Sequence, residues 1–163
     1  MLVRIISPVL SFTADEIWER IPEALKEEES VHLSKWIEAN PEYLNEELAK
    51  KWDKIARLRR EVNKKLEAER QTGLIGHSLD ARVLLNITND DYSFLKDYTE
   101  DEVSDLFIVS QTKFVDDELE KSEIEGVSIG VTKALGKKCE RCWKYDVDLK
   151  DGLCPHCRKV LGK

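Results

Sequence analysis

The sequence predicts an α+β protein built from three successive parts. Apolar residues recur every three or four positions up to residue 71, which is the period of an amphipathic helix. From residue 79 they alternate with polar residues, as in a strand with one buried face. All four cysteines lie near the end of the 163-residue chain. We therefore expect a helical bundle remnant with a long helix (1–73), a small, mostly antiparallel α+β module (74–136) and a C-terminal four-cysteine ribbon (137–163).

The composition is that of a soluble globular chain of one or two domains. Charged residues make up 36% of it and hydrophobic residues 41%. No stretch approaches the roughly 18 consecutive apolar residues of a membrane span. The apolar start, "MLVRIISPVLSF", lacks the small-residue cleavage site of a signal peptide. We expect a cytoplasmic protein with no membrane partner.

Charge is unevenly distributed along the chain. Residues 1–49 carry a net charge of −7 and residues 88–126 carry −10, whereas residues 50–70 carry +5 and residues 137–163 carry +4. From charge alone, ordinary solvated faces are the simpler interpretation. The alternative is a polyanion such as RNA, which most of this surface would repel and only the two basic segments would accept.

Two short elements are expected before residue 40. The motif "TADE" at residues 13–16 has the Ser/Thr-x-x-Glu pattern of a capping box, which predicts the start of a helix that Pro22 ends. A charged loop follows. We then expect a short extended segment whose apolar side chains point toward an apolar neighbour: Val31, Leu33 and Trp36.

A long helix is predicted over residues 42–71. Asn40 would cap it, Pro41 would occupy its first position, and Gly73 follows its end. Its narrow apolar stripe consists of Leu44, Leu48, Trp52, Ile55, Leu58, Val62 and Leu66.

The opposite side of this helix is basic. At about 100° per residue, Lys50, Arg57, Arg60 and Lys64 fall together there, with Lys54 and Lys65 beside them. A solvated helix back is one interpretation. The other is a row of cations for a nucleic-acid backbone, because each cation that contacts a phosphate releases a counterion. The candidate backbone contacts are Lys54, Arg57, Arg60 and Lys64.

The middle part reads as strands separated by acidic segments. "SLDARVLLNI" alternates as a strand, and "LFIVSQTKFV" and "GVSIGVTKAL" predict two more, with Gly126 in a turn and Gly130 at a bulge. "DDELEKSEIEG" is expected to be a mobile acidic loop. "DDYSFLKDYTEDEVSDLF" predicts one or two short helices whose buried side chains are Phe94, Leu95, Val103 and Leu106.

The four cysteines form two Cys-x-x-Cys pairs, Cys139/Cys142 and Cys154/Cys157. Two tight turns of this kind can place four thiolates tetrahedrally around one zinc ion. Four protein ligands leave no position for water, so the zinc should be structural. A redox-active dithiol pair is the alternative, and we expect His156 to be an exposed side chain.

The first cysteine pair lies among cations and aromatic residues. A segment of this size buries little surface, so zinc supplies its folding free energy and Trp143 has little core to enter. An exposed ring beside cations is suited to stack on an unpaired base while the cations hold phosphates. The alternative is that Trp143 packs on the adjacent sheet. The candidate RNA-binding residues are Arg141, Trp143, Lys138 and Lys144.

Several stretches together resemble a known family. They are "SPVLSFTADEIWERIP", "SVHLSKW", "LRREVNKKLEAERQTGLIGHSLDARVLL", and "GKKCERCW" with "CPHC". In this order they resemble the C-terminal end of bacterial-type isoleucyl-tRNA synthetases. The related valyl and leucyl enzymes carry helices similar to "FTADEIW", whereas "IGHSLDA" followed by "GKKCERCW" is much more specific to the isoleucyl branch. In one departure, the second cysteine pair reads Cys-Pro-His-Cys where the family commonly has Cys-Pro-Arg-Cys.

The resemblance implies part of a larger ATP-binding ligase. The "HIGH" and "KMSKS" signatures of the family's catalytic domain and its editing domain are absent from this sequence, so we expect neither isoleucine activation nor editing from this chain. Its implied partners are isoleucine tRNA and the catalytic and editing domains of the parent enzyme. Its implied role is to help position the anticodon region for aminoacylation, with family-like contacts at Arg141 and Trp143. A structural or protein-interaction zinc ribbon without RNA contact is the alternative.

Overall fold

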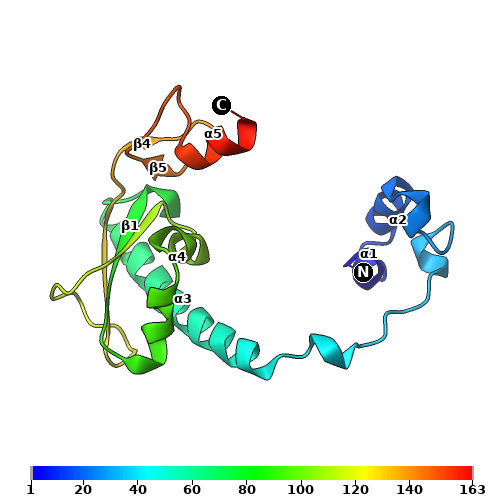
Figure 1. Cartoon of the computed structure of the whole chain (residues 1–163), viewed down its shortest axis with the longest axis horizontal. Coiled ribbons are helices and arrows are strands. Elements are labelled where there is room, and N and C mark those ends of the chain that lie inside the picture. Colours follow the sequence, from blue (N-terminus) through cyan, green and yellow to red (C-terminus); the bar gives the residue numbers. More distant parts are fainter. Residues whose placement is uncertain (1, 163) are drawn as a thin grey trace. The chain divides into compact units, whose positions relative to one another are not determined.

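The computed structural model describes residues 2–162, which form two compact units that divide between Asn45 and Glu46 (Figure 1). The α+β class is confirmed, since the chain contains helices, a three-stranded sheet and a two-stranded sheet. Within the described residues, no helix is both long and apolar enough to cross a membrane. The predicted domain boundaries at 73/74 and 136/137 stay a prediction.

The first unit is built around a small apolar cluster of Ala14, Trp18 and Val31. It contains α1 (Leu2–Ile6) and α2 (Ser11–Arg20), followed by 3-10 turns at Glu23–Leu25 and Val31–Leu33. The Trp18 indole N–H donates to the carbonyl oxygen of Glu28 at 2.9 Å. This bond ties the charged loop back onto α2.

Two predictions for this unit are wrong. No capping box forms at residues 13–16, because α2 already begins at Ser11 and Thr13 lies inside its first turn. Val31 is buried as expected, but it starts a 3-10 turn in which the Ser30 hydroxyl accepts from the His32 N–H. That turn leaves Leu33 exposed, and Trp36 beyond it is also exposed.

The long helix, α3, spans Glu46–Gln71 and starts four residues later than predicted. Asn40 does act as a cap, accepting from the Glu42 N–H at 3.0 Å, but it caps a separate 3-10 turn at Pro41–Tyr43. Leu44 is extended and interrupts the helical hydrogen bonds. The predicted end is confirmed, with Gly73 in the left-handed region at φ +79°.

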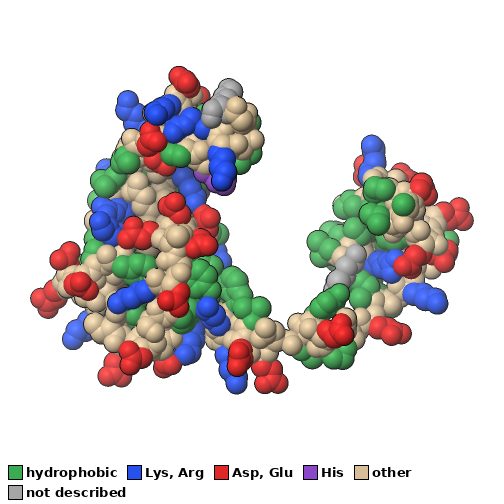
Figure 2. All heavy atoms as spheres, in the orientation of Figure 1, with side chains coloured by type: hydrophobic (Ala, Val, Ile, Leu, Met, Phe, Trp, Pro, Cys, Tyr) green, Lys and Arg blue, Asp and Glu red, His purple; other side chains and the backbone are tan. Residues whose placement is uncertain are grey.

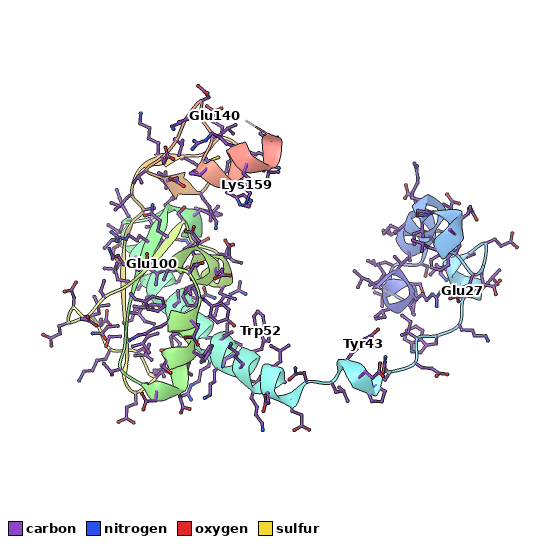
Figure 3. All side chains as sticks on the ribbon, viewed as in Figure 1. Glu27, Tyr43, Trp52, Glu100, Glu140 and Lys159 are labelled. Atoms are coloured by element: carbon purple, nitrogen blue, oxygen red, sulfur yellow. The ribbon has the colours of Figure 1, made fainter. Side chains whose placement is uncertain are left out.

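The apolar stripe of α3 is buried only in its C-terminal half. Ile55, Leu58, Val62 and Leu66 enter the main core, whereas Leu44, Leu48 and Trp52 are about half exposed or more. Trp52 projects outward from the helix in Figure 3.

The larger sheet has the order β2-β1-β3. Central β1 (Ala81–Ile87) alternates buried and half-buried residues as predicted. It pairs antiparallel with β3 (Val127–Lys133) and parallel with β2 (Gln111–Phe114), so the sheet is mixed. The parallel pairing arises because the chain crosses over through a 3-10 helix (Asp90–Asp97) and α4 (Glu100–Phe107) before entering β2.

The details of this module depart from the prediction at several positions. Leu106 and Phe107 belong to α4 and not to a strand. Gly130 forms no bulge and pairs in register with Leu84; a Cβ there would lie 3.1 Å from the Leu119 side chain. Leu95 and Val103 are buried as predicted, whereas Phe94 and Leu106 are half-buried, and the buried aromatic positions are Tyr92 and Phe107.

The acidic segment between β2 and β3 packs against the module. Ile124 is buried, and Lys121 forms an antiparallel bridge with Ser128 of β3. In Figure 2, Asp and Glu side chains cover this loop at the left edge of the molecule. The loop is acidic as expected, and it is anchored to β3 and to the main core.

Candidate metal centre and nucleic-acid interface

The four cysteines converge at the C-terminal end of the second unit. Cys139 and Cys142 lie in the turn between β4 (Lys137–Lys138) and β5 (Tyr145–Asp146), an antiparallel pair. Cys154 is the N-cap of α5 (Pro155–Leu161), and Cys157 lies in its first turn. This arrangement brings two segments eleven residues apart to one point.

The sulfur positions fit one zinc ion. All four Sγ atoms lie within 4.8 Å of one another, and Cys142 Sγ is 3.7 Å from Cys154 Sγ. Tetrahedral Zn–S bonds of about 2.3 Å would separate neighbouring sulfurs by about 3.8 Å. Three of the cysteines are buried and the fourth is half-buried, and His156 is exposed as expected. A full set of four thiolates leaves no ligand position for water, so the zinc is structural.

Backbone N–H groups lower the pKa of one cysteine in this cluster. Burial alone would raise the pKa of Cys139, but N–H groups of Cys142, Cys154 and Arg141 outweigh it and lower the pKa to about 6. The Cys154 N–H lies 3.4 Å from Cys139 Sγ. Burial and the neighbouring thiols raise the pKa of Cys142 to about 12, even though the Lys144 N–H acts against this. Zinc therefore enters a site in which some thiols still hold protons that it must displace.

The ribbon is joined to the larger sheet by specific polar contacts. The Tyr145 N–H donates to the Ser110 hydroxyl at 2.7 Å, and Ser110 in turn donates to the Leu79 carbonyl. The Gln111 side chain accepts from the Leu135 N–H at 2.8 Å and donates to the Leu135 carbonyl oxygen at 3.0 Å. These bonds hold the ribbon next to the start of β2.

Gly136 lets the chain pass close to the backbone of β5 where it enters the ribbon. Its φ is +91°, and a Cβ at this position would lie 2.1 Å from the carbonyl oxygen of Asp146. Any other residue would collide with the backbone of β5.

Trp143 stands out from the ribbon surface. Its side chain is 60% exposed, and Lys138 Nζ lies 5.5 Å from the ring centroid. Its φ of +67° is uncommon for a bulky residue, and its N–H donates to the Cys139 carbonyl at 3.0 Å. The structure thus shows an exposed ring beside a cation, and not a ring packed on the sheet.

The other two predicted RNA contacts of the ribbon have partners within the protein. Arg141 Nη1 lies 3.6 Å from Cys157 Sγ, and the Lys144 ammonium pairs with Asp105 of α4. No local sequence pattern indicates these pairs, because the partners are 16 and 39 residues away.

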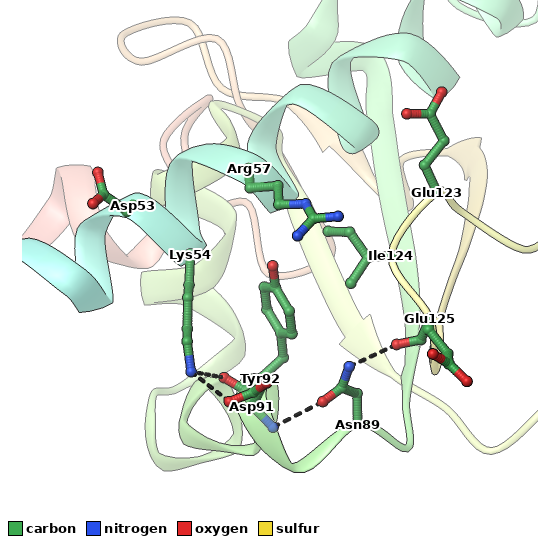
Figure 4. Close-up of a pocket in the computed structure, with 9 residues that line it drawn as sticks. All are labelled: Asp53, Lys54, Arg57, Asn89, Asp91, Tyr92, Glu123, Ile124 and Glu125. Atoms are coloured by element: carbon green, nitrogen blue, oxygen red, sulfur yellow. Dashed lines mark hydrogen bonds and ion pairs between the residues drawn. The ribbon is translucent and has the colours of Figure 1, made fainter.

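The basic side of α3 is partly neutralised by acidic side chains of the same unit. Lys54 pairs with Asp91 at 2.7 Å, as Figure 4 shows, and Lys64 pairs with both Glu61 and Glu123. In the part of the chain from residue 2 to 162, Arg57 and Arg60 form no ion pair.

Arg57 extends over a polar pocket next to Tyr92 and Ile124 (Figure 4). Carboxylates of Asp53, Glu123 and Glu125 also line this pocket, so it is not a purely cationic surface.

Two protein families match parts of this chain. The family described as "Anticodon-binding domain of tRNA ligase" matches residues 1–85, and "Zinc finger found in FPG and IleRS" matches residues 136–160. The second match contains all four cysteines.

Proteins similar to this chain include isoleucine–tRNA ligases. Those of Petrotoga mobilis and Geobacter sulfurreducens are each 42% identical to this chain, over 166 and 169 residues, and each alignment covers 98% of it. That of Kosmotoga olearia is 38% identical over 169 residues, covering 99% of it. The chain spans about 18% of the length of these relatives.

Proposed function

Because the chain belongs to the family of anticodon-binding domains of tRNA ligases, we propose that it is the tRNA-binding C-terminal part of an isoleucine–tRNA ligase. In this proposal it holds the anticodon region of isoleucine tRNA so that the distant acceptor end reaches an active site elsewhere in the ligase. It would work in the cytoplasm, where free cysteines remain reduced and available to zinc. The catalytic and editing domains of the ligase are its proposed covalent partners.

The exposed Trp143 ring carries this proposal. A non-glycine residue held in the left-handed region is costly, and such strain is concentrated at functional positions. The position directly after Cys142 directs the ring into solvent, where an unpaired anticodon base could stack on it. Lys138 beside the ring would contact the adjoining phosphate.

Other backbone contacts are proposed for α3. Of the four cations predicted there, Arg57 and Arg60 are available without breaking an ion pair, whereas Lys54 and Lys64 would first have to leave their carboxylates. In the ribbon, Lys144 would likewise have to leave Asp105. We therefore propose that Arg57 and Arg60 contribute most of any phosphate contact made by this helix.

The alternative is a structural or protein-interaction ribbon without RNA contact. The ion pairs of Lys54, Lys64 and Lys144 favour it, because they use cations for internal packing. In that case the acidic residues of segment 88–126 would face a protein partner.

Replacement of Trp143 by glycine distinguishes tRNA binding from a ribbon without RNA contact. Glycine adopts positive φ readily, so Trp143→Gly should keep the ribbon folded while it removes the stacking surface. Stacking on an aromatic ring is worth about 1–3 kcal/mol per base, so we expect affinity for isoleucine tRNA to fall about tenfold or more. Binding of the zinc-loaded chain is measured over a salt series, with a non-cognate tRNA in parallel.

Trp36→Ala is the matched control, because Trp36 is equally exposed but lies in the first unit. Equal affinity of Trp143→Gly and the unsubstituted chain would favour the structural alternative. In the complete ligase, the same glycine substitution should lower kcat/KM for tRNA charging and leave isoleucine activation unchanged.

A further inference from the structure

The four sulfurs of the zinc centre differ in their hydrogen-bond donors. Cys139 Sγ accepts from the backbone N–H of Cys154 at 3.4 Å. N–H donors of this kind stabilise thiolate charge and orient the ligand. Cys139 therefore has its own backbone donor.

Cys157 lies in the first turn of α5. The N–H groups that follow it are used by the helix: the Arg158 N–H donates to the Cys154 carbonyl at 3.0 Å. A cysteine in a Cys-x-x-Cys turn can accept from the amides that follow it, but a cysteine inside a helix cannot, since these amides point toward the preceding turn.

The Arg141 side chain supplies a hydrogen-bond donor to Cys157 Sγ. Its Nη1 lies 3.6 Å from Cys157 Sγ, within hydrogen-bond range for sulfur. Apart from neighbouring thiols, it is the donor that the structure of residues 2–162 provides to this sulfur. The same bond is the main reason that the pKa of Arg141 lies above its usual value. The guanidinium comes from the first cysteine pair, so the contact also links the two halves of the metal site.

We propose that Arg141 is a positioning residue of the zinc centre, which donates a hydrogen bond to Cys157 Sγ and so slows the release of zinc. This role is independent of RNA binding. It also means that the guanidinium faces the metal site, while Trp143 two residues later faces solvent.

Zinc transfer to a chromophoric chelator tests the proposal. The zinc-loaded 163-residue chain and its Arg141→Ala variant are mixed with excess chelator, and the rate of zinc loss is followed by absorbance. Loss of an outer hydrogen bond to a metal ligand typically costs about 10- to 100-fold in metal affinity, so zinc should leave Arg141→Ala about tenfold faster or more.

Lys159→Ala is the matched control, because it also removes one positive charge from the ribbon and Lys159 is exposed on α5 (Figure 3). Zinc should leave this variant within about twofold of the unsubstituted rate, since screened surface charges interact weakly. Equal rates for Arg141→Ala and Lys159→Ala would overturn the proposal.

A cobalt-substituted chain provides a second readout, and Arg141→Gln a second variant if the alanine variant fails to fold. Loss of the hydrogen bond should shift the sulfur-to-cobalt charge-transfer absorption in either Arg141 variant and leave it unchanged in Lys159→Ala. An unchanged absorption in the Arg141 variants would overturn the proposal, whatever the result of the tRNA-binding experiment.

Discussion

Thr112 is a buried residue whose hydroxyl contributes no hydrogen bond. It lies in β2 opposite Val83 of β1, and its Oγ1 has no partner among residues 2–162. A buried hydroxyl without a partner is costly, whereas an apolar group of the same shape is not. We expect Thr112→Val to raise the free energy of unfolding by about 1 kcal/mol, measured by urea denaturation.

Thr112→Ser is the control for this prediction, because it keeps the hydroxyl and loses a methyl group. It should be less stable than the unsubstituted chain. A valine variant no more stable than the serine variant would show that the hydroxyl has a partner in solution, such as water.

At the residue scale, chemistry carried by a short motif could be predicted, and chemistry carried by distant partners could not. The spacing of Cys139, Cys142, Cys154 and Cys157 was sufficient to predict a zinc site, because the ligands are few and their geometry is fixed. The partners of Arg141 and Lys144 depend on the folded positions of Cys157 and Asp105, which no local pattern encodes.

At the element scale, Glu61 links α3 to the acidic loop before β3. Its carboxylate is buried, and it accepts from Lys64 Nζ at 2.8 Å and from the Glu123 N–H at 3.0 Å. The hydrogen bond from Lys64 and then that from Glu123 lower the pKa of Glu61 below its usual 4.5, against the opposing effect of burial. Because the folded-state pKa is depressed, its stabilisation is fully present above about pH 4.5 and is lost as the pH falls through the folded-state pKa.

The corresponding prediction concerns Glu61→Gln. We expect this variant to lose about 1–2 kcal/mol of unfolding free energy at pH 7, because hydrogen bonds to a charged group are replaced by weaker ones. Its stability should also fall less steeply than that of the unsubstituted chain below pH 4.5. Urea denaturation at a series of pH values measures both effects.

Glu67→Gln is the matched control, since Glu67 pairs with Arg70 on the exposed surface of the same helix. Exposed pairs of this kind contribute little, so this variant should retain nearly all of the stability and its pH dependence. Equal losses in both variants would contradict the assignment to Glu61.

The elements themselves were predictable where local signals agree. The end of α3 follows from Gly73, and the alternation of β1 from its apolar residues. The predicted start of α3 was wrong because Asn40 and Pro41 suit a 3-10 turn as well as a helix. The parallel pairing of β2 was not predicted, since strand partners depend on the crossover through α4 and not on the strand's own pattern.

At the scale of the whole molecule, the chain combines parts that differ in how they are stabilised. Helix α3, α4 and the three-stranded sheet share a continuous core that includes Leu58, Leu85 and Phe107. The ribbon's buried cluster consists of the cysteines, with Leu149 and Leu153 packed against them. An apolar core of this size cannot hold a fold without its metal.

Zinc removal should therefore unfold the ribbon and spare the rest of the chain. After chelation we expect amide hydrogen exchange to increase from about residue 137 onward, including the Tyr145 N–H that donates to Ser110. Amides of β1 and of the buried half of α3 should keep their protection, because their core contains no residue of the ribbon. The fluorescence of Trp143 should change as its backbone leaves the left-handed conformation that it has in the folded ribbon.

Hydrogen exchange followed by mass spectrometry, before and after chelation and again after zinc is returned, measures this outcome. Restored protection on adding zinc distinguishes local unfolding from irreversible damage. If protection in β1 fell together with that of the ribbon, the zinc centre would stabilise the entire second unit. In that case the contacts of Ser110 and Gln111 would join the two into one cooperative structure.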